Sequence, residues 1–218
     1  MVRDRLKRGV MEYSEGPYRN PWFLVAKKQA GEYRIVVAAM RLNEVTIRDA
    51  NLPPNIDQFA EAFSGCQITS LLDVFSSYDQ LLLDARDRDM TAISTPIGNV
   101  RLTRLPQGAT NSLSQFQRAI QFVLADIMPH VTIPYMDDVG VKGPRSRYDE
   151  KEAAPGIRRY VLEHLQNLDQ VLERLERAGM TIGGDKAQFC ILGLHMVGYV
   201  TDADGRSPET AKIIKILE

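Results

Sequence analysis

Three aspartates stand where the surrounding sequence predicts buried strands. Asp73 interrupts the apolar run from Ile68 to Phe75, and the pair Asp137 and Asp138 separates two short apolar strands. A charge buried without a partner is costly, so each carboxylate requires a partner or a cation. Adjacent acids at a turn also repel each other, which raises the pKa of one of them unless a cation is near. A single aspartate in such a place is most often a turn former or a helix cap, and this alternative stays open for each.

The remaining patterns predict an α+β fold. Apolar residues recur at helical spacing over 56–63, 112–127 and 158–178, and a further helix is predicted from Pro208 to the end. Strands are predicted over 22–28, 33–38, 68–75, 91–96, 100–105, 131–135, 139–142, near 181 and over 196–200, with Gly98-Asn99 as one turn and 142–156 as a surface loop. The order of these elements suggests an antiparallel sheet with helices on one face, related to the split βαβ arrangement.

Composition leaves the function open. The net charge of −1 neither supports nor excludes a nucleic-acid partner. The sequence contains no run of about 18 apolar residues, so no membrane span is expected. Cys66 and Cys190 match no metal-binding spacing, and we interpret both as reduced core cysteines of an intracellular protein.

Three acids at neighbouring strand ends suit phosphoryl transfer. Magnesium prefers oxygen ligands, with phosphates completing its coordination shell. Two such ions about 4 Å apart would hold the attacking hydroxyl and the leaving pyrophosphate. The chemistry fits the acids, although their spacing alone does not name the reaction.

A set of ordered motifs carries a family resemblance. The string Tyr135-Met136-Asp137-Asp138 resembles the hallmark of reverse transcriptases. In chain order, the blocks that resemble enzymes of gypsy-type LTR retrotransposons are Trp22–Arg34, Leu71–Gln80, Leu105–Asn111 with Gln115–Arg118, Gly184–Phe189 and Met196–Val200. A four-residue string is weak by itself, but several blocks in the right order are specific. The resemblance extends from about Pro21 to the C-terminus.

This resemblance implies the fingers and palm of a right-hand polymerase, with a ferredoxin-like palm sheet. The implied fingers are residues 1–67 with 84–108 returning to them, and the implied palm is 68–83 and 109–200. Residues 201–218 would begin the segment after the primer grip, with thumb and RNase H absent. The implied partners are an RNA template, a DNA primer and a dNTP, with RNase H, integrase and protease in the parent polyprotein and no membrane. The implied location is the cytoplasm, in a virus-like particle of the parent element, with the nucleus as an alternative.

The resemblance also implies roles for individual residues. Two Mg²⁺ ions, or Mn²⁺ as an alternative, would be held by Asp73, Asp137 and the Val74 carbonyl, with Asp138 as a supporting acid. Lys186 would protonate the pyrophosphate leaving group. The residues expected to bind the nucleotide are Lys27, Arg34, Tyr78, Gln107 and Gly108, with Tyr78 excluding a 2′-hydroxyl. Without the resemblance, Tyr78 would be read as a core tyrosine, and Lys27 and Arg34 as solvated charges on a hairpin.

Some positions depart from the family pattern. Ala38 and Met40 stand where relatives usually carry Asp and Arg, and Asp79 stands where many have His. The sequence therefore leaves two functions: an RNA-directed DNA polymerase, or an idle or domesticated remnant that only binds nucleic acid.

Overall fold

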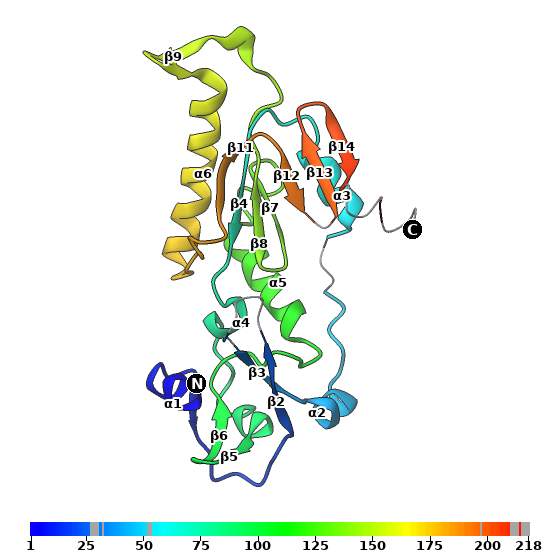
Figure 1. Cartoon of the computed structure of the whole chain (residues 1–218), viewed down its shortest axis with the longest axis vertical. Coiled ribbons are helices and arrows are strands. Elements are labelled where there is room, and N and C mark those ends of the chain that lie inside the picture. Colours follow the sequence, from blue (N-terminus) through cyan, green and yellow to red (C-terminus); the bar gives the residue numbers. More distant parts are fainter. Residues whose placement is uncertain (27–30, 32, 52–53, 197, 210–213, 215–218) are drawn as a thin grey trace. The chain divides into compact units, whose positions relative to one another are not determined.

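The protein is described by a computed structural model that covers residues 1–218 apart from 27–30, 32, 52–53, 197, 210–213 and 215–218. Its contacts form two compact units, drawn in Figure 1. The first comprises Met1–Asn51 and Ser76–Phe116, and the second Leu52–Phe75 and Gln117–Glu218. The helix over 56–63 thus groups with the second unit, whereas the resemblance implied fingers up to residue 67. The assignment of fingers and palm to residue ranges stays a prediction.

The first unit contains a three-stranded sheet, a β-hairpin and short helices. Its elements are α1 (Val2–Lys7), β1 (Met11–Tyr13), β2 (Trp22–Ala26), β3 (Tyr33–Val37), α2 (Met40–Val45), α4 (Ser77–Gln80), η1 (Arg88–Thr91), β5 (Ile93–Thr95), β6 (Gly98–Leu102) and the start of α5 (Ser112–Val123). The sheet has the order β1-β6-β5, and β2 pairs with β3 in the predicted hairpin. Their inward residues form one core of Met11, Ile35, Val37, Ile93, Val100 and Leu102.

The second predicted hairpin exists, but its turn lies elsewhere than expected. Thr95 pairs with Gly98, so Pro96 and Ile97 form the turn, and Asn99 lies within β6. The Thr95 hydroxyl accepts a hydrogen bond from the Ile97 N–H at 3.3 Å and donates to the Gly98 carbonyl at 2.6 Å. A side chain that bonds local backbone in this way fixes the turn more strongly than the Gly-Asn pair does.

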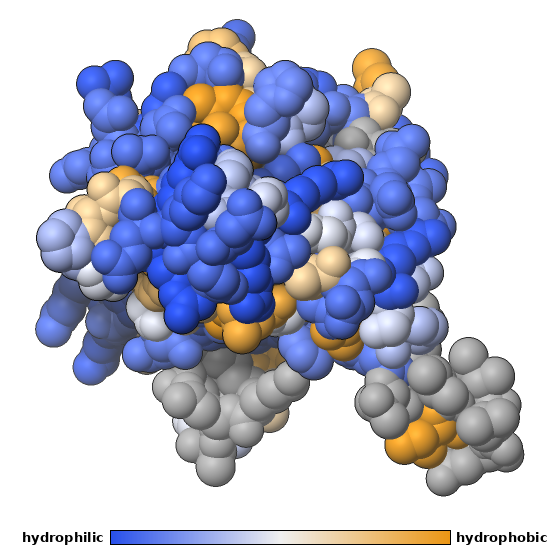
Figure 2. Space-filling model, turned by 90° about the horizontal axis from the view of Figure 1, so that it is seen from above, coloured by the Kyte–Doolittle hydropathy of each residue, from blue (hydrophilic) through white to orange (hydrophobic). Residues whose placement is uncertain are grey.

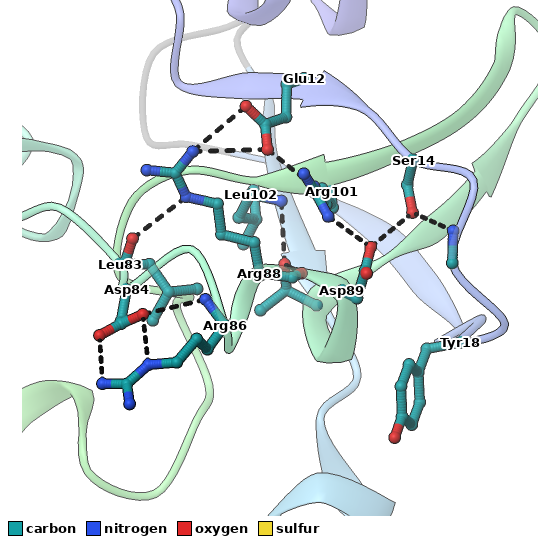
Figure 3. Close-up of polar contacts among 12 residues, drawn as sticks. Glu12, Ser14, Tyr18, Leu83, Asp84, Arg86, Arg88, Asp89, Arg101 and Leu102 are labelled. Carbon is teal, nitrogen blue, oxygen red and sulfur yellow. Dashed lines mark hydrogen bonds and ion pairs between the residues drawn. The ribbon is translucent and has the colours of Figure 1, made fainter.

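An ion-pair network joins β1, β6 and η1, and Figure 3 shows its contacts. Arg101 Nε donates to Glu12 at 2.7 Å, and Arg101 Nη1 donates to Asp89 at 2.7 Å. Arg88 reaches the same Glu12 carboxylate at 3.3 Å, and Ser14 Oγ donates to Asp89 at 3.0 Å. Each acid in this network therefore faces at least one arginine.

The second unit is built on a four-stranded antiparallel sheet. Its elements are α3 (Ile56–Phe63), β4 (Thr69–Asp73), the rest of α5, β7 (Thr132–Tyr135), β8 (Asp138–Val141), η2 (Tyr148–Glu150), β9 (Glu152–Ala154), β10 (Ile157–Arg158), α6 (Arg159–Arg177), β11 (Gln188–Ile191), β12 (Leu194–Met196), β13 (Tyr199–Asp202) and β14 (Gly205–Pro208). The sheet order is β11-β4-β8-β7, and every pair in it is antiparallel. The predicted helices over 56–63 and 158–178 are confirmed to within one residue.

Alternating residues of β4 face opposite sides of this sheet. On one side, Ser70 Oγ lies 2.7 Å from Nε2 of the buried His164 in α6, which Figure 1 shows beside the sheet. His164 Nδ1 donates to the Lys142 carbonyl at 3.2 Å, so Nε2 is the acceptor and the ring is neutral. Burial accordingly lowers the pKa of His164. On the other side, Leu71 packs in a cluster with Phe63 of α3.

Two expectations for the second half are corrected. The segment expected to be one strand over 196–200 is divided between β12 and β13, which pair antiparallel, and β14 follows at the predicted 203–204 turn. The loop expected over 142–156 contains η2 and β9. Pro208 ends β14, and most of the helix predicted after it lies outside the described residues.

The cysteines differ in their surroundings. Cys66 is buried as expected, but Cys190 is exposed, which corrects the prediction of a core position. Cys190 lies in β11, an edge strand of the sheet, and its positive φ of 53° marks an irregularity there.

The surface is mainly polar where Figure 2 shows it. That figure views the molecule from the end that carries β9, and the hydrophobic residues on this face form small, separate groups. Among the described residues, no helix has both the length and the apolar composition needed to cross a bilayer.

Candidate active site

The register of two neighbouring strands brings the three aspartates together. Asp73 at the end of β4 lies directly opposite Asp138 at the start of β8. The Val74 N–H donates to the Asp137 carbonyl at 2.8 Å, which extends the pairing past the strand end. Directly opposed residues have Cβ atoms about 5 Å apart, and like charges so placed destabilise a sheet. The fold therefore gathers acids at a point where they repel one another.

A buried glutamine fixes the turn between β7 and β8. Met136 in this turn has a positive φ of 57°, which is uncommon for a residue with a side chain. Gln117 of α5 is fully buried; its Oε1 accepts from the Met136 N–H at 2.8 Å, and its Nε2 donates to the Pro134 carbonyl at 3.1 Å. Sequence reasoning quoted Gln117 within a motif but gave it no role. Its position on the inward face of a predicted helix was the available signal.

The carboxylates differ in their exposure and protonation. Asp73 is buried, Asp137 is exposed, and Asp138 lies between these extremes. Burial, followed by the charges of Asp137 and Asp73, raises the pKa of Asp138 to about 6. The Asp138 carboxylate is therefore the one whose negative charge this surrounding favours least. A cation near it would reverse that effect.

Lys186 supplies one positive charge to this group. Its Nζ lies 2.9 Å and 3.1 Å from the two carboxylate oxygens of Asp73. The Gly183 carbonyl accepts from the N–H groups of Lys186 and Ala187, and the Gly183 N–H donates to the Asp73 carbonyl at 2.8 Å. This turn carries Lys186 back to the end of β4. Bonding to Asp73 raises the pKa of the lysine, so its ammonium stays charged.

The oxygen donors suit a hard divalent cation, although they are not gathered into a ready-made cage. Among the described residues, no three or more His, Cys, Asp and Glu side chains are spaced as the ligands of one metal ion. Carboxylates with few other protein donors are nevertheless the set that magnesium takes when phosphate oxygens complete its shell. The chemistry of the donors therefore fits the predicted metal.

The other predicted site residues lie in the first unit, apart from Lys27, which is outside the described residues. Arg34 is exposed on β3, opposite Val25. Tyr78 lies in α4, with its ring 6.1 Å from that of Phe116. The nucleotide-binding residues and the three acids thus belong to different units.

The loop with Gln107 and Gly108 requires a glycine. Gly108 has a positive φ of 98°, and a Cβ at this position would lie 3.3 Å from the Val37 carbonyl oxygen. Asn43 of α2, which sequence reasoning missed, holds this loop: its Nδ2 donates to the Gly108 carbonyl at 3.0 Å, and its Oδ1 accepts from the Thr110 N–H at 2.8 Å. The contact spans more than sixty residues, so no local pattern announces it.

The sequence matches the family described as "Reverse transcriptase (RNA-dependent DNA polymerase)" over residues 25–213. The chain belongs to the reverse transcriptase family. Its sequence relatives include the retrovirus-related Pol polyproteins of the Drosophila melanogaster transposons gypsy, 29% identical over 100% of this chain, and opus, 31% identical over 100%. This reverse transcriptase chain spans about a fifth of the length of those polyproteins, 20% in both cases.

Solved structures give the same fold. The foamy viral protease-reverse transcriptase dRH in complex with double-stranded DNA matches 100% of this chain and 35% of its own, with a TM-score of 0.83 at 22% identity. The corresponding complex with an RNA/DNA hybrid matches 100% of this chain and 27% of its own, with a TM-score of 0.81 at 21% identity. The expected right-hand polymerase fold is therefore confirmed for this reverse transcriptase, with antiparallel sheets and helices.

Proposed function

We propose that this chain is the polymerase domain of a retrotransposon reverse transcriptase. In this role it adds a dNMP from a dNTP to the 3′-hydroxyl of a primer on an RNA or DNA template. The observation that carries the proposal is the meeting of Asp73, Asp137 and Asp138 at two neighbouring strand ends in a member of this family. A sheet gains no stability from acids so placed, which favours a functional reason for them.

The carboxylates are the proposed holders of two Mg²⁺ ions. Asp73 and Asp137 would be the main ligands, with the Val74 carbonyl as an extra oxygen and Asp138 as a supporting acid. When bound, the metal would lower the pKa of the attacking hydroxyl and balance the charge on the phosphates. The raised pKa of Asp138 supports this assignment, because its carboxylate is stabilised when a cation is near.

Lys186 is the proposed proton donor to the leaving pyrophosphate. Its ammonium now bonds to Asp73, and 76% of its side chain is exposed, so it can turn towards a ligand without uncovering a core. As the bond between the α- and β-phosphates breaks, the proton from Nζ would pass to the leaving oxygen. The lysine would then regain a proton from water.

The first unit is the proposed source of nucleotide contacts. Arg34 and Lys27 would bind the triphosphate, since a guanidinium fork and an ammonium both suit phosphate oxygens. Gln107 would contact the nucleotide beside the close backbone approach at Gly108. Tyr78 would stand beneath the sugar and exclude a 2′-hydroxyl, which favours dNTPs.

The proposed partners follow from the relatives. The gypsy and opus proteins are polyproteins, so we infer that RNase H, integrase and protease belong to the parent element of this chain. A cytoplasmic virus-like particle is the proposed location. The foamy viral structures hold double-stranded DNA or an RNA/DNA hybrid, and a primed template is the matching ligand proposed here.

The test compares the chain with its Asp137→Asn variant on a primed RNA template with dNTPs and Mg²⁺. Extension by the wild type that is lost in the variant would support the enzyme. No extension by either protein, with both folded by circular dichroism, would refute polymerase activity for this chain. The idle remnant that binds nucleic acid is then tested by titration of a labelled RNA/DNA duplex.

A further inference from the structure

The turn that carries Tyr78 is short and strained. Helix α4 has four residues, and the chain enters it through Ser76, which has left-handed backbone angles of φ 46° and ψ 48°. Such a conformation costs on the order of 1 kcal/mol or more in a residue with a side chain, so surrounding contacts must hold it. The position of the Tyr78 ring therefore depends on what fixes α4.

An ion pair from the N-terminal helix reaches this turn. Arg5 of α1 donates from Nη2 to Asp79 Oδ1 at 2.7 Å, across 74 residues of sequence. Both side chains are mostly covered, with 24% of Arg5 and 21% of Asp79 exposed. Asp79 is the immediate neighbour of Tyr78, so a force on its carboxylate acts directly on the turn.

Helix α1 gives Arg5 little other purpose. It has six residues, none of them buried, and lacks a side-chain cap. Helices so short are not stable by themselves in water, so tertiary contacts must hold α1 in place. Val2 and Leu6 pack against the core of the first unit, and Arg5 is the residue of α1 whose described side-chain bond extends to α4.

The same ion pair adjoins the second proposed nucleotide residue. A small cavity of about 10 Å³ is lined by Arg5, Met11, Ile35, Val37, Asp79, Leu102, Leu105 and Gln107. Most of its walls are apolar, and a charge pair beside such walls interacts more strongly than one in open water. Arg5 Nε is buried there without a hydrogen-bond partner among the described residues, so the guanidinium is aimed at Asp79 despite a cost.

We propose that Arg5 is a positioning residue, which through Asp79 sets where Tyr78 and Gln107 meet the incoming nucleotide. The inference rests on the proposed polymerase function and extends it to selection of the sugar. Arg5 itself touches no substrate. Its loss therefore changes how well the nucleotide is bound and discriminated, and leaves the carboxylates in the second unit as they are.

The kinetic test uses single-nucleotide primer extension with dNTP and rNTP. Arg5→Met is expected to raise the KM for dNTP about fivefold or more, to reduce the preference for dNTP over rNTP, and to change kcat less than threefold. Asp79→Asn, which keeps the shape of the side chain, is expected to do the same. The double variant should be no worse than either single variant, because the residues act as one pair. Arg5→Lys should restore part of the effect.

The matched control is Arg8→Met. Arg8 lies just after the same helix and pairs with Asp4, but both of these side chains are more than half exposed, at 60% and 57%. This variant should keep the KM and the sugar preference of the wild type. Arg5→Met and Asp79→Asn variants that fold and also match the wild type in both quantities would overturn the inference. If Arg5→Met does not fold, the Asp79→Asn variant decides.

A second readout separates this inference from the proposed function. In protein with ¹³C-labelled tyrosine, the Tyr78 resonance is assigned with Tyr78→Phe and compared between variants without substrate. A shift in Arg5→Met that is absent in Arg8→Met supports positioning even if the chain extends no primer. An unchanged Tyr78 resonance in Arg5→Met overturns it, whether or not the wild type is active.

Discussion

The two units treat their carboxylates in opposite ways. In the first, Glu12 and Asp89 both bond to Arg101, and Glu12 also meets Arg88. In the second, Asp73 lies across a strand pair from Asp138, with Asp137 beside them. Arg101 accordingly lowers the pKa of Asp89, whereas burial and neighbouring acids raise that of Asp138.

The difference separates charges that serve the fold from charges kept for a ligand. Compensated acids join three elements of the first unit, and no further partner is required for their charge. At the strand ends of the second unit, Lys186 provides one ammonium for three acids. A site with uncompensated charge of this kind is a common mark of catalysis, because the missing cation arrives with the substrate.

The largest expected effect is on activity and comes from Asp73→Asn. Loss of a ligand carboxylate should lower the extension rate about a thousandfold, equivalent to about 4 kcal/mol in the barrier. Stability should not fall, because the change also removes a repulsive charge. Asp89→Asn is the matched variant: extension should stay within about threefold while the melting temperature drops. Equal behaviour of the two variants in both assays would erase the contrast between the units.

The next effect concerns the uncharged support of the acidic turn. Gln117→Leu leaves the Met136 N–H and the Pro134 carbonyl without their side-chain partner. Each unsatisfied buried group costs about 1–3 kcal/mol, so unfolding in urea should show a loss of about 2–4 kcal/mol. Gln115→Leu in the same helix replaces an exposed residue and should change little. A small loss at Gln117 would mean that the turn holds its shape without this support.

A third effect is a pH dependence of stability at Asp138. Its folded pKa of about 6 lies above that of an unfolded aspartate, about 3.9, so the folded state binds this proton more tightly. The contribution to stability is therefore full below about pH 4 and is lost as pH rises to about 6.

Asp138→Asn should remove this loss. Without metal, the variant should gain on the order of 2–3 kcal/mol over the wild type between pH 4 and pH 7, measured by urea unfolding. Adding Mg²⁺ should shrink the gain, since a bound cation stabilises the carboxylate. A difference that is constant with pH would contradict the raised pKa.

A smaller effect is expected from Arg101→Met in the compensated network. Asp89 and Glu12 would lose a partner but remain open to water, so the melting temperature should fall by only a few degrees. The loss should be present near neutral pH and should disappear as acid protonates Asp89, because a lowered pKa stabilises the fold only while the group is ionised. A loss unchanged at pH 3 would point to packing of the Arg101 stem instead.

The smallest expected effect belongs to Arg86→Met. Arg86 pairs with Asp84 at 2.8 Å, and the pair holds the pKa of Asp84 at about 2, but 87% of the Arg86 side chain is exposed. The partners are two residues apart and can also meet in the unfolded chain. The melting temperature should therefore not change measurably. A clear drop would show that proximity in a unit matters more than coverage from water.

Much of the architecture follows from local pattern. The helix over 56–63 is announced by apolar spacing and by Asn55, whose side chain accepts from the Asp57 N–H. The long helix α6 ends before Gly179, which has a positive φ of 68°. Such signals lie within a few residues, so the sequence alone carries them. Short irregular pieces, such as α1 and α4, lack them because their stability comes from distant contacts.

The candidate site divides along the same line. The sequence by itself determined that acids stand at Asp73, Asp137 and Asp138, because a charge in an apolar strand is visible without a structure. Only the tertiary structure decided that Asp73 faces Asp138, that Gln117 holds the turn, and that Arg5 reaches Asp79. These contacts join residues from different elements, and strand register and helix packing select them. Periodicity reports which face of an element is buried, whereas the partner on that face is chosen by the whole fold.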